Sequence, residues 1–289
     1  MSMDVLQDRI RKLKCPIIVD FSMKMEHIPA VVRGEKSDAE AYCDYCDALL
    51  EALKNNAAGV RFCFDRFALL GALENLKKLL AKAMELGYYV LLDGPQTMTP
   101  WMAEEACAAI FGDDSGYPCH GMILSPWAGS DCIKPFLNAC KDGGKSLFFA
   151  VRTANKTAPE LQDLMTGGRL THVAAADIVN RHGEPIFGKC GYSYIGALTA
   201  ATNAASVSGL RSKYKRMFLL VDGIDYPGGN AKNCSLAFDK FGRGAAVCAG
   251  PDVTAAWLKA ETDGTDYSDL AVKAVERLKG NIARYVSIL

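Results

Sequence analysis

The chain has 289 residues, of which 50% are hydrophobic and 23% are charged, so it can bury a sizeable core and shows no sign of disorder. Its 33 basic and 33 acidic side chains cancel, which leaves no electrostatic case for nucleic acid or an anionic membrane as a partner. No apolar run approaches the roughly 20 residues that span a bilayer, and the amphipathic N-terminus lacks the apolar core of a secretion signal. We therefore expect a cytoplasmic protein.

Short apolar segments alternate with helical patterns along the whole chain. The segments are continuously apolar, as strands are when both of their faces are buried. The predicted strands lie near residues 16–21, 58–64, 88–93, 121–125, 147–152, 194–198, 217–221 and 245–248.

A helical pattern follows each predicted strand. The predicted helices cover residues 37–54, 71–86, a third opened by Thr99-Pro100, 131–140, 159–182 with an interruption at Gly167-Gly168, 202–213, a stretch after Gly228-Gly229 that ends at 241, and 267–288. Eight such units predict an α/β fold, a single (β/α)₈ TIM barrel domain over residues 1–289, with N-terminal and C-terminal helices packing on it. An open doubly wound sheet is the alternative, but no G-x-G-x-x-G turn follows the first strand.

The cysteines and histidines do not show a metal-binding pattern. Cys43 and Cys46 lie on one face of a predicted helix, and no second pair follows at zinc spacing. Cys63 and Cys248 end strands and could point into a barrel mouth, but a nucleophile there needs a neighbouring histidine base. We expect the cysteines to be mostly core residues, and we expect no metal or cofactor.

The stretch YYVLLDGPQTMTPWM, residues 88–102, contains a strand that ends in a carboxylate, Asp93. The loop that follows such a strand is where an α/β barrel keeps its chemistry. Its residues are poor catalysts, because Gly94, Pro95 and Met98 offer no acid, base or nucleophile.

Several segments of the chain resemble those of one known family. FAVRTAN, residues 149–155, resembles the F-V-L-V-R-T-S-N segment of the bacterial form of orotidine 5′-monophosphate decarboxylase. SPWAG at 125–129 is similar to its N-P-Y-L-G, IGALT at 195–199 to its V-G-A-T, and residues 223–229 to its P-G-x-G-A-Q-G-G. The resemblance covers residues 13–257 in order, and it implies the same barrel fold.

The family's catalytic positions can be carried across one at a time. The resemblance places the first-strand aspartate on Asp20, which is kept, and the lysine that ends the second strand on Arg61. The third-strand motif D-x-K-x-x-D falls on Asp93, Pro95 and Met98. The resemblance implies that its lysine is the proton donor and that its second aspartate acts across a dimer interface, so both groups are lost here.

The phosphate-binding end is also altered. The resemblance places the family's phosphate-loop glutamine on Pro227 and its phosphate-binding arginine on Pro251. Three carboxylates in the loops after strands seven and eight would repel a phosphate if they faced the pocket: Asp222, Asp225 and Asp252. The ligand-binding candidates that remain are Asp20, Arg61, Asp93, Ser125, Arg152, Thr153, Gly228 and Gly229.

Some of these candidates have plainer interpretations. Arg61 and Asp93 could pair with each other as a structural ion pair, Arg152 could cap a strand end, and Gly228-Gly229 could form a tight loop rather than a phosphate site.

Three hypotheses follow. The first is a divergent relative that has lost decarboxylation and acts in binding, regulation or assembly. It would form a homodimer or pair with an active homologue, and it would bind a small-molecule ligand that the sequence does not identify. The second is an enzyme of different chemistry that uses Asp20, Arg61 and Asp93 on a neutral or cationic ligand. The third is a genuine decarboxylase of pyrimidine biosynthesis, which requires a lysine near strand three, whereas none lies between Lys82 and Lys134.

Overall fold

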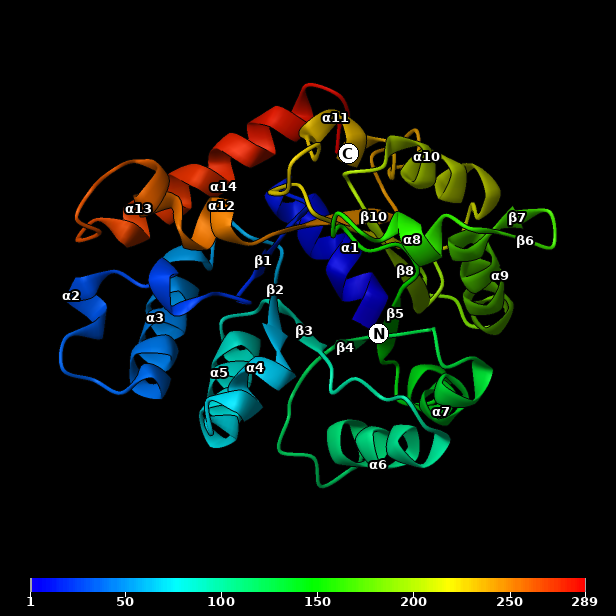
Figure 1. Ribbon diagram of the computed structural model, residues 1–289, viewed down its shortest axis with the longest axis horizontal. Coiled ribbons are helices and arrows are strands. Elements are labelled where there is room, and N and C mark those ends of the chain that lie inside the picture. Colours follow the sequence, from blue (N-terminus) through cyan, green and yellow to red (C-terminus); the bar gives the residue numbers. More distant parts are fainter. Residues whose placement is uncertain (1, 289) are drawn as a thin grey trace.

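The computed structural model describes residues 2–288 and contains a closed barrel of parallel strands surrounded by helices (Figure 1). The predicted TIM barrel is confirmed, and each predicted strand end agrees with the structure to within two residues. The barrel strands are β1 (Ile17–Asp20), β2 (Gly59–Cys63), β3 (Tyr89–Asp93), β4 (Gly121–Leu124), β5 (Ser146–Ala150), β8 (Ile195–Ala200), β9 (Leu219–Asp222) and β10 (Ala245–Ala249).

The strand register brings acidic and basic residues to one end of the barrel. Asp20 of β1 pairs in register with Arg61 of β2, and Asp93 of β3 pairs with Cys63 of β2. The carboxyl ends of all eight strands point the same way, because the closed sheet is parallel throughout. The last residues of β1, β3 and β9 therefore meet at one mouth.

The longer predicted helices are present. The helix predicted from residue 37 is α3 (Asp38–Leu53), and Ser37 forms a capping box in which its hydroxyl accepts the Glu40 N–H while the Glu40 carboxylate accepts the Ser37 N–H. The others are α1 (Ser2–Leu13), α5 (Leu73–Glu85), α6 (Pro100–Phe111), α9 (Thr171–Gly183), α10 (Ala204–Lys213) and α14 (Tyr267–Ala283). The terminal helices α1 and α14 pack against β3 and β1 respectively.

Three predicted helices are wrong in extent. The segment predicted as a helix over 131–140 is three short pieces, η2 (Ser130–Cys132), η3 (Lys134–Phe136) and α7 (Leu137–Lys141), because Pro135 has no N–H to continue a helix. The helix predicted up to residue 241 is only α11 (Ala231–Ser235), and the final helix stops at Ala283 rather than at residue 288.

The segment predicted as an interrupted helix over 159–182 contains a hairpin. α8 (Pro159–Gln162) is followed by β6 (Met165–Thr166) and β7 (Arg169–Leu170), and only then by α9. Gly167 and Gly168 form the turn with φ of +54° and +78°, a backbone region that residues with a Cβ rarely adopt. The interruption was predicted, but not the reversal of the chain.

The structure also has short helices that the sequence did not predict: η1 (Met25–His27), α2 (Ala30–Arg33), α4 (Phe64–Leu69), α12 (Pro251–Thr254) and α13 (Ala256–Lys259). Three of them follow barrel strands closely, so they shape the loops around the mouth. Within residues 2–288, no helix is long and apolar enough to cross a membrane.

Candidate functional site: an arginine held by three aspartates at the barrel mouth

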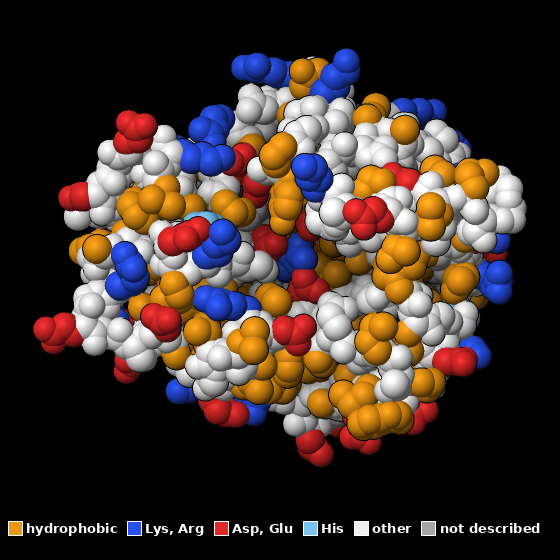
Figure 2. All heavy atoms as spheres, in the orientation of Figure 1, with side chains coloured by type: hydrophobic (Ala, Val, Ile, Leu, Met, Phe, Trp, Pro, Cys, Tyr) orange, Lys and Arg blue, Asp and Glu red, His pale blue; other side chains and the backbone are white. Residues whose placement is uncertain are grey.

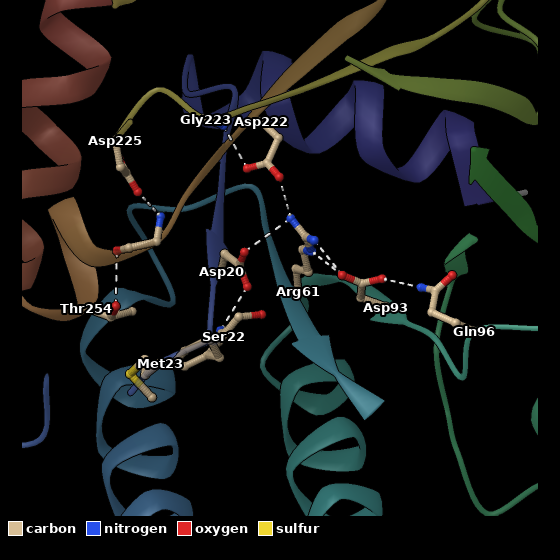
Figure 3. A network of polar contacts seen from close by, with 12 residues as sticks. Asp20, Ser22, Met23, Arg61, Asp93, Gln96, Asp222, Gly223, Asp225 and Thr254 are labelled. Carbon is tan, nitrogen blue, oxygen red and sulfur yellow. Dashed lines mark hydrogen bonds and ion pairs between the residues drawn. The ribbon is translucent and has the colours of Figure 1, made fainter. Parts of the chain in front are cut away.

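Arg61 lies at the centre of the mouth and is bound by carboxylates from three strands (Figure 3). Its Nη1 forms an ion pair with Asp20 Oδ2 at 3.1 Å and donates to Asp222 Oδ2 at 3.2 Å. Its Nε donates to Asp93 Oδ2 at 3.1 Å, and its Nη2 donates to the same oxygen. All three guanidinium nitrogens are therefore engaged by carboxylates.

The electrostatics keep this arginine charged. Arg61 is only 9% exposed, and burial alone would lower its pKa. The negative charges of Asp20, Asp93 and Asp222 outweigh this effect and hold the pKa well above its usual range. Arg61 cannot serve as a proton donor near neutral pH, because a guanidinium in this setting does not lose its proton.

A cavity of about 430 Å³ opens above this network. Figure 2 shows it as a hollow near the middle of the face, with basic and acidic atoms at its floor. Asp20, Arg61 and Asp222 contribute to the floor, and the loops after β1, β9 and β10 form the walls. The wall residues include Ser22, Lys24, His27, Asp225, Tyr226 and Pro251.

Asp225 is a further carboxylate of the cavity. Its Oδ2 accepts the N–H of Gly250 at 2.6 Å, while its Oδ1 is buried and has no hydrogen-bond partner within residues 2–288. Burial, reinforced by the like charges of Asp222 and Asp20, raises the pKa of Asp225 to about 6. This carboxyl therefore changes its charge close to physiological pH.

Comparison with known proteins adds a sequence relationship over nearly the whole chain. No protein-family model matches. An orotidine 5′-phosphate decarboxylase of Caldicellulosiruptor saccharolyticus is 27% identical over 293 residues, covering 94% of this chain and 96% of the relative. One from Rhodopirellula baltica is 26% identical over 283 residues, covering 91% and 93%. The chain is a relative of the orotidine 5′-phosphate decarboxylases.

Solved structures of the same kind share the fold. A putative orotidine-monophosphate-decarboxylase of Toxoplasma gondii superimposes with a TM-score of 0.79 at 16% identity, covering 98% of each chain. A putative orotidine 5′-phosphate decarboxylase of Streptomyces avermitilis gives 0.78 at 21% identity, covering 99% of this chain and 95% of the other.

The segment after β3, onto which the resemblance carries the decarboxylase motif, holds other side chains. Pro95 lies in the loop after Asp93, and the Gly94–Pro95 peptide bond is cis. The amide of Gln96 donates to Asp93 Oδ1 at 3.2 Å, so both oxygens of Asp93 are engaged within the chain. Met98 is 65% exposed and lies outside the network.

Pro227 and Pro251, onto which the resemblance carries the family's phosphate-binding positions, both border the cavity. Asp222 is the last residue of β9 rather than a loop residue. Asp252 forms an ion pair with Lys259 and does not line the cavity, so only two of the three suspected carboxylates face it.

The candidates carried over from the R-T-S-N segment are engaged locally. Arg152 is 4% exposed and forms a bidentate ion pair with Asp163, with both contacts at 3.0 Å, which favours its structural interpretation. The N–H of Thr153 donates to the side-chain oxygen of Gln162 at 2.9 Å. Ser125 accepts the N–H of Trp127 in the loop after β4.

The glycine loop retains little that could hold a phosphate. The N–H of Gly229 donates to the Tyr226 carbonyl at 2.8 Å, and α11 starts only at Ala231. The side chain of Asn230 already accepts the N–H of Asn233 at the start of this helix. The tight-loop interpretation of Gly228-Gly229 fits this geometry.

Sequence reasoning missed Lys24, His27 and Tyr226, which the structure brings to the cavity. Lys24 and His27 reach it through η1, a short helix with no periodic pattern to predict it. Lys24 pairs with Glu26 at 3.2 Å. Burial lowers the pKa of His27, so its imidazole is neutral near pH 7.

The cysteines have structural surroundings. Cys43, Cys46 and Cys248 are buried, and burial raises the pKa of each thiol. Within residues 2–288, no group of three or more His, Cys, Asp or Glu side chains is arranged to hold a metal ion.

Proposed function

We propose that this relative of the orotidine 5′-phosphate decarboxylases no longer decarboxylates orotidine 5′-monophosphate and works as a binding or regulatory protein. The observation that carries the proposal is the set of side chains at the barrel mouth. Pro95 occupies the position where the resemblance implies the proton donor, and Arg61 is bound by three carboxylates.

The chemistry of decarboxylation explains why this matters. Loss of CO₂ leaves carbanion character on a ring carbon, and an ammonium group must stabilise that charge and deliver a proton. Pro95 has neither a side-chain donor nor a backbone N–H. Arg61 keeps its proton and points its donors at carboxylates, so it cannot replace the missing lysine.

The phosphate end supports the same proposal. Binding of a remote phosphate commonly supplies much of an enzyme's transition-state stabilisation. Here prolines occupy the two anchor positions, and Asp222 and Asp225 present carboxylates to the same cavity. A phosphate dianion would be repelled by these carboxylates.

Complementation tests the proposal. The gene for this chain is expressed in a uracil-requiring strain that lacks its own decarboxylase, beside an active relative and the same relative with its motif lysine changed to proline. We expect no growth with this chain or with the altered relative. Growth with this chain would show that decarboxylation is retained, which is the genuine-decarboxylase alternative.

We also propose that the chain forms a homodimer, or pairs with an active homologue, through the surface that follows β3, and that it acts in the cytoplasm. Met98 and Trp101 are 65% and 62% exposed, and adjacent exposed apolar side chains of this size are typical of association surfaces. Light scattering of the purified protein tests the dimer.

One observation favours a second candidate, an enzyme of different chemistry. Asp225 borders the cavity with a pKa raised to about 6 by burial, which suits a general acid or base near neutral pH. Asp20, Arg61 and Asp93 would then position the substrate. Turnover of any neutral or cationic metabolite that is lost in Asp225→Asn would establish this candidate.

A further inference from the structure

The mouth cavity has a marked excess of acceptors. Asp20, Asp222 and Asp225 line it, and Ser22 and Tyr226 add hydroxyl groups. We propose that this cavity is a binding site for a small organic cation that carries a guanidinium or primary ammonium group. This inference names the ligand class of the site and rests on the proposed function.

The cationic side chains at the cavity do not cancel the negative charge that its carboxylates present to a ligand. Arg61 directs all of its guanidinium nitrogens at carboxylates, so it has no pair of N–H groups free to bind an anion in a bidentate manner. Lys24 lines the cavity and forms a solvent-exposed ion pair with Glu26, and His27 is neutral because burial lowers its pKa. The carboxylates of Asp20, Asp222 and Asp225 therefore outnumber the cationic groups of Lys24 and Arg61 that line the cavity, so a cation would meet complementary charge.

Asp225 gives independent evidence that the cavity lacks a compensating positive charge. Within residues 2–288 its Oδ1 has no hydrogen-bond partner, although its Oδ2 accepts the Gly250 N–H, and a carboxylate that is only half satisfied is costly unless a positive charge lies nearby. The charged groups that face Asp225 are Asp222 on β9, Asp20 on β1 and Lys259 on α13. Lys259 is held by Asp252, so the local balance stays negative.

The size and lining of the cavity select an organic cation. A volume of about 430 Å³ lies in the range of small-molecule sites. Tyr226 is 51% exposed at the rim, and its aromatic face can attract a cationic group. A metal ion is disfavoured, because residues 2–288 contain no group of three or more suitable ligands.

Calorimetric titration of the full chain with matched probes tests the inference. The probes are methylguanidinium, its uncharged isostere methylurea, putrescine as a diamine and inorganic phosphate as an anion. We expect methylguanidinium or putrescine to bind, and methylurea and phosphate not to bind. Equal binding of methylguanidinium and methylurea, binding of phosphate alone, or no binding of either cation at low millimolar concentration would each overturn the inference.

The pH dependence and two variants give a second test. A cation binds better when Asp225 is ionised, so affinity should rise about tenfold between about pH 5 and pH 7 and then level off. Asp225→Asn should lose this rise and weaken binding about tenfold at pH 7, whereas Asp131→Asn, at an exposed position of the short helix η2, should change neither. An Asp225→Asn variant that binds like the parent would contradict the inference.

The two proposals fail separately. Growth in the complementation assay would remove the proposed function whatever the titrations show. Absence of cation binding together with absence of growth would remove only the ligand class.

Discussion

The side chain with the most consequence in this molecule is Arg61, which joins β2 to β1, β3 and β9 through three carboxylates. Removing a buried partner leaves the opposite charges uncompensated, so Arg61→Met should lower the free energy of unfolding by about 3 to 5 kcal/mol at neutral pH. The loss should shrink in acid, where the carboxylates take up protons. Urea unfolding at both pH values measures it.

A double-variant cycle shows whether the effect comes from the network. Arg61→Met combined with Asp93→Asn should cost less than the sum of the two single changes, because the second change removes a carboxylate that the first left unpaired. Arg284→Met, at the exposed residue that follows the last helix, serves as the control and should be nearly neutral. Full additivity would show that Arg61 acts outside the network.

Asp225 should make the protein less stable as pH rises. Its folded pKa of about 6 lies above its ordinary value of 3.8, so the folded chain holds a proton that the unfolded chain has already released between these values. The stability from this proton is present below about pH 4 and is lost as pH rises through about 6. Asp225→Asn mimics the protonated form. We expect its free energy of unfolding to exceed that of the parent by about 1 to 3 kcal/mol at pH 8 and to equal it near pH 4.

Thermal unfolding at the two pH values tests this prediction, with Asp131→Asn as the matched surface control. A variant that is less stable than its parent at pH 8 would show that the ionised carboxylate is favourable. A stabilising change at a site residue would also fit the common trade-off between stability and function.

At the scale of single elements, the loop after β5 depends on the ion pair between Arg152 and Asp163. Arg152 is 4% exposed, and the Asp163 carboxylate also lies 3.1 Å from His172 Nδ1 at the start of α9. Asp163→Ala should destabilise the protein by about 3 kcal/mol, because it leaves a buried guanidinium without its carboxylate. Glu160→Ala, at an exposed position of α8, should cost little.

Chemical denaturation measures both variants. An equal effect of the two changes would mean that the pair does not organise the loop. A loss confined to hydrogen-exchange protection of α8 and the β6–β7 hairpin would place the effect in local opening rather than in global unfolding.

The barrel strands could be predicted from sequence because each is an apolar run bounded by turn residues, and all eight agree with the structure to within two residues. Helix ends were less predictable where a single proline or glycine decides where the helix stops. Pro135 divides one helix into pieces, and Gly167-Gly168 turns another into a hairpin. The pattern indicated the interruption at Gly167-Gly168 but not the reversal of the chain there, and it did not indicate a break at Pro135.

The candidate site was partly predictable. Asp20, Arg61 and Asp93 were expected at the mouth because they lie at or near the carboxyl ends of neighbouring strands, and an ion pair between Arg61 and Asp93 was one of the interpretations. The contact of Arg61 with Asp222 was not expected, since β2 and β9 are not neighbours in the sheet. It depends on how far a long side chain reaches across the barrel, which a single sequence does not specify.

At the scale of the whole molecule, the proposed loss of function and the preserved fold have different physical requirements. The barrel depends on apolar strands and helix faces, and these are present along the whole chain. Catalysis in the decarboxylases depends, as the resemblance implies, on a few charged groups at the mouth, and the positions onto which the resemblance carries them hold prolines, a methionine and an arginine engaged by carboxylates. A relative can therefore keep the fold while changing the chemistry of its site.

The last prediction concerns a mixed dimer with an active relative. The resemblance implies that each active site takes an aspartate from the neighbouring subunit, and this chain would supply Met98 there. The relative's site would then lack its carboxylate, and the site of this chain would lack its lysine at Pro95, so the mixed dimer should have little or no decarboxylase activity. Co-expression with two affinity tags isolates the mixed dimer for assay.

The Met98→Asp variant of this chain provides the decisive control. It returns the missing carboxylate to the relative's site and leaves the site of this chain without a lysine, so the mixed dimer should regain activity at one of its two sites. The mixed dimer with unaltered Met98 should then be less active than the mixed dimer with Met98→Asp, although Met98 is exposed and changing it should hardly affect stability. Recovery of only separate homodimers, or equal activity of the two mixed dimers, would show that this chain does not regulate a relative by sharing its site.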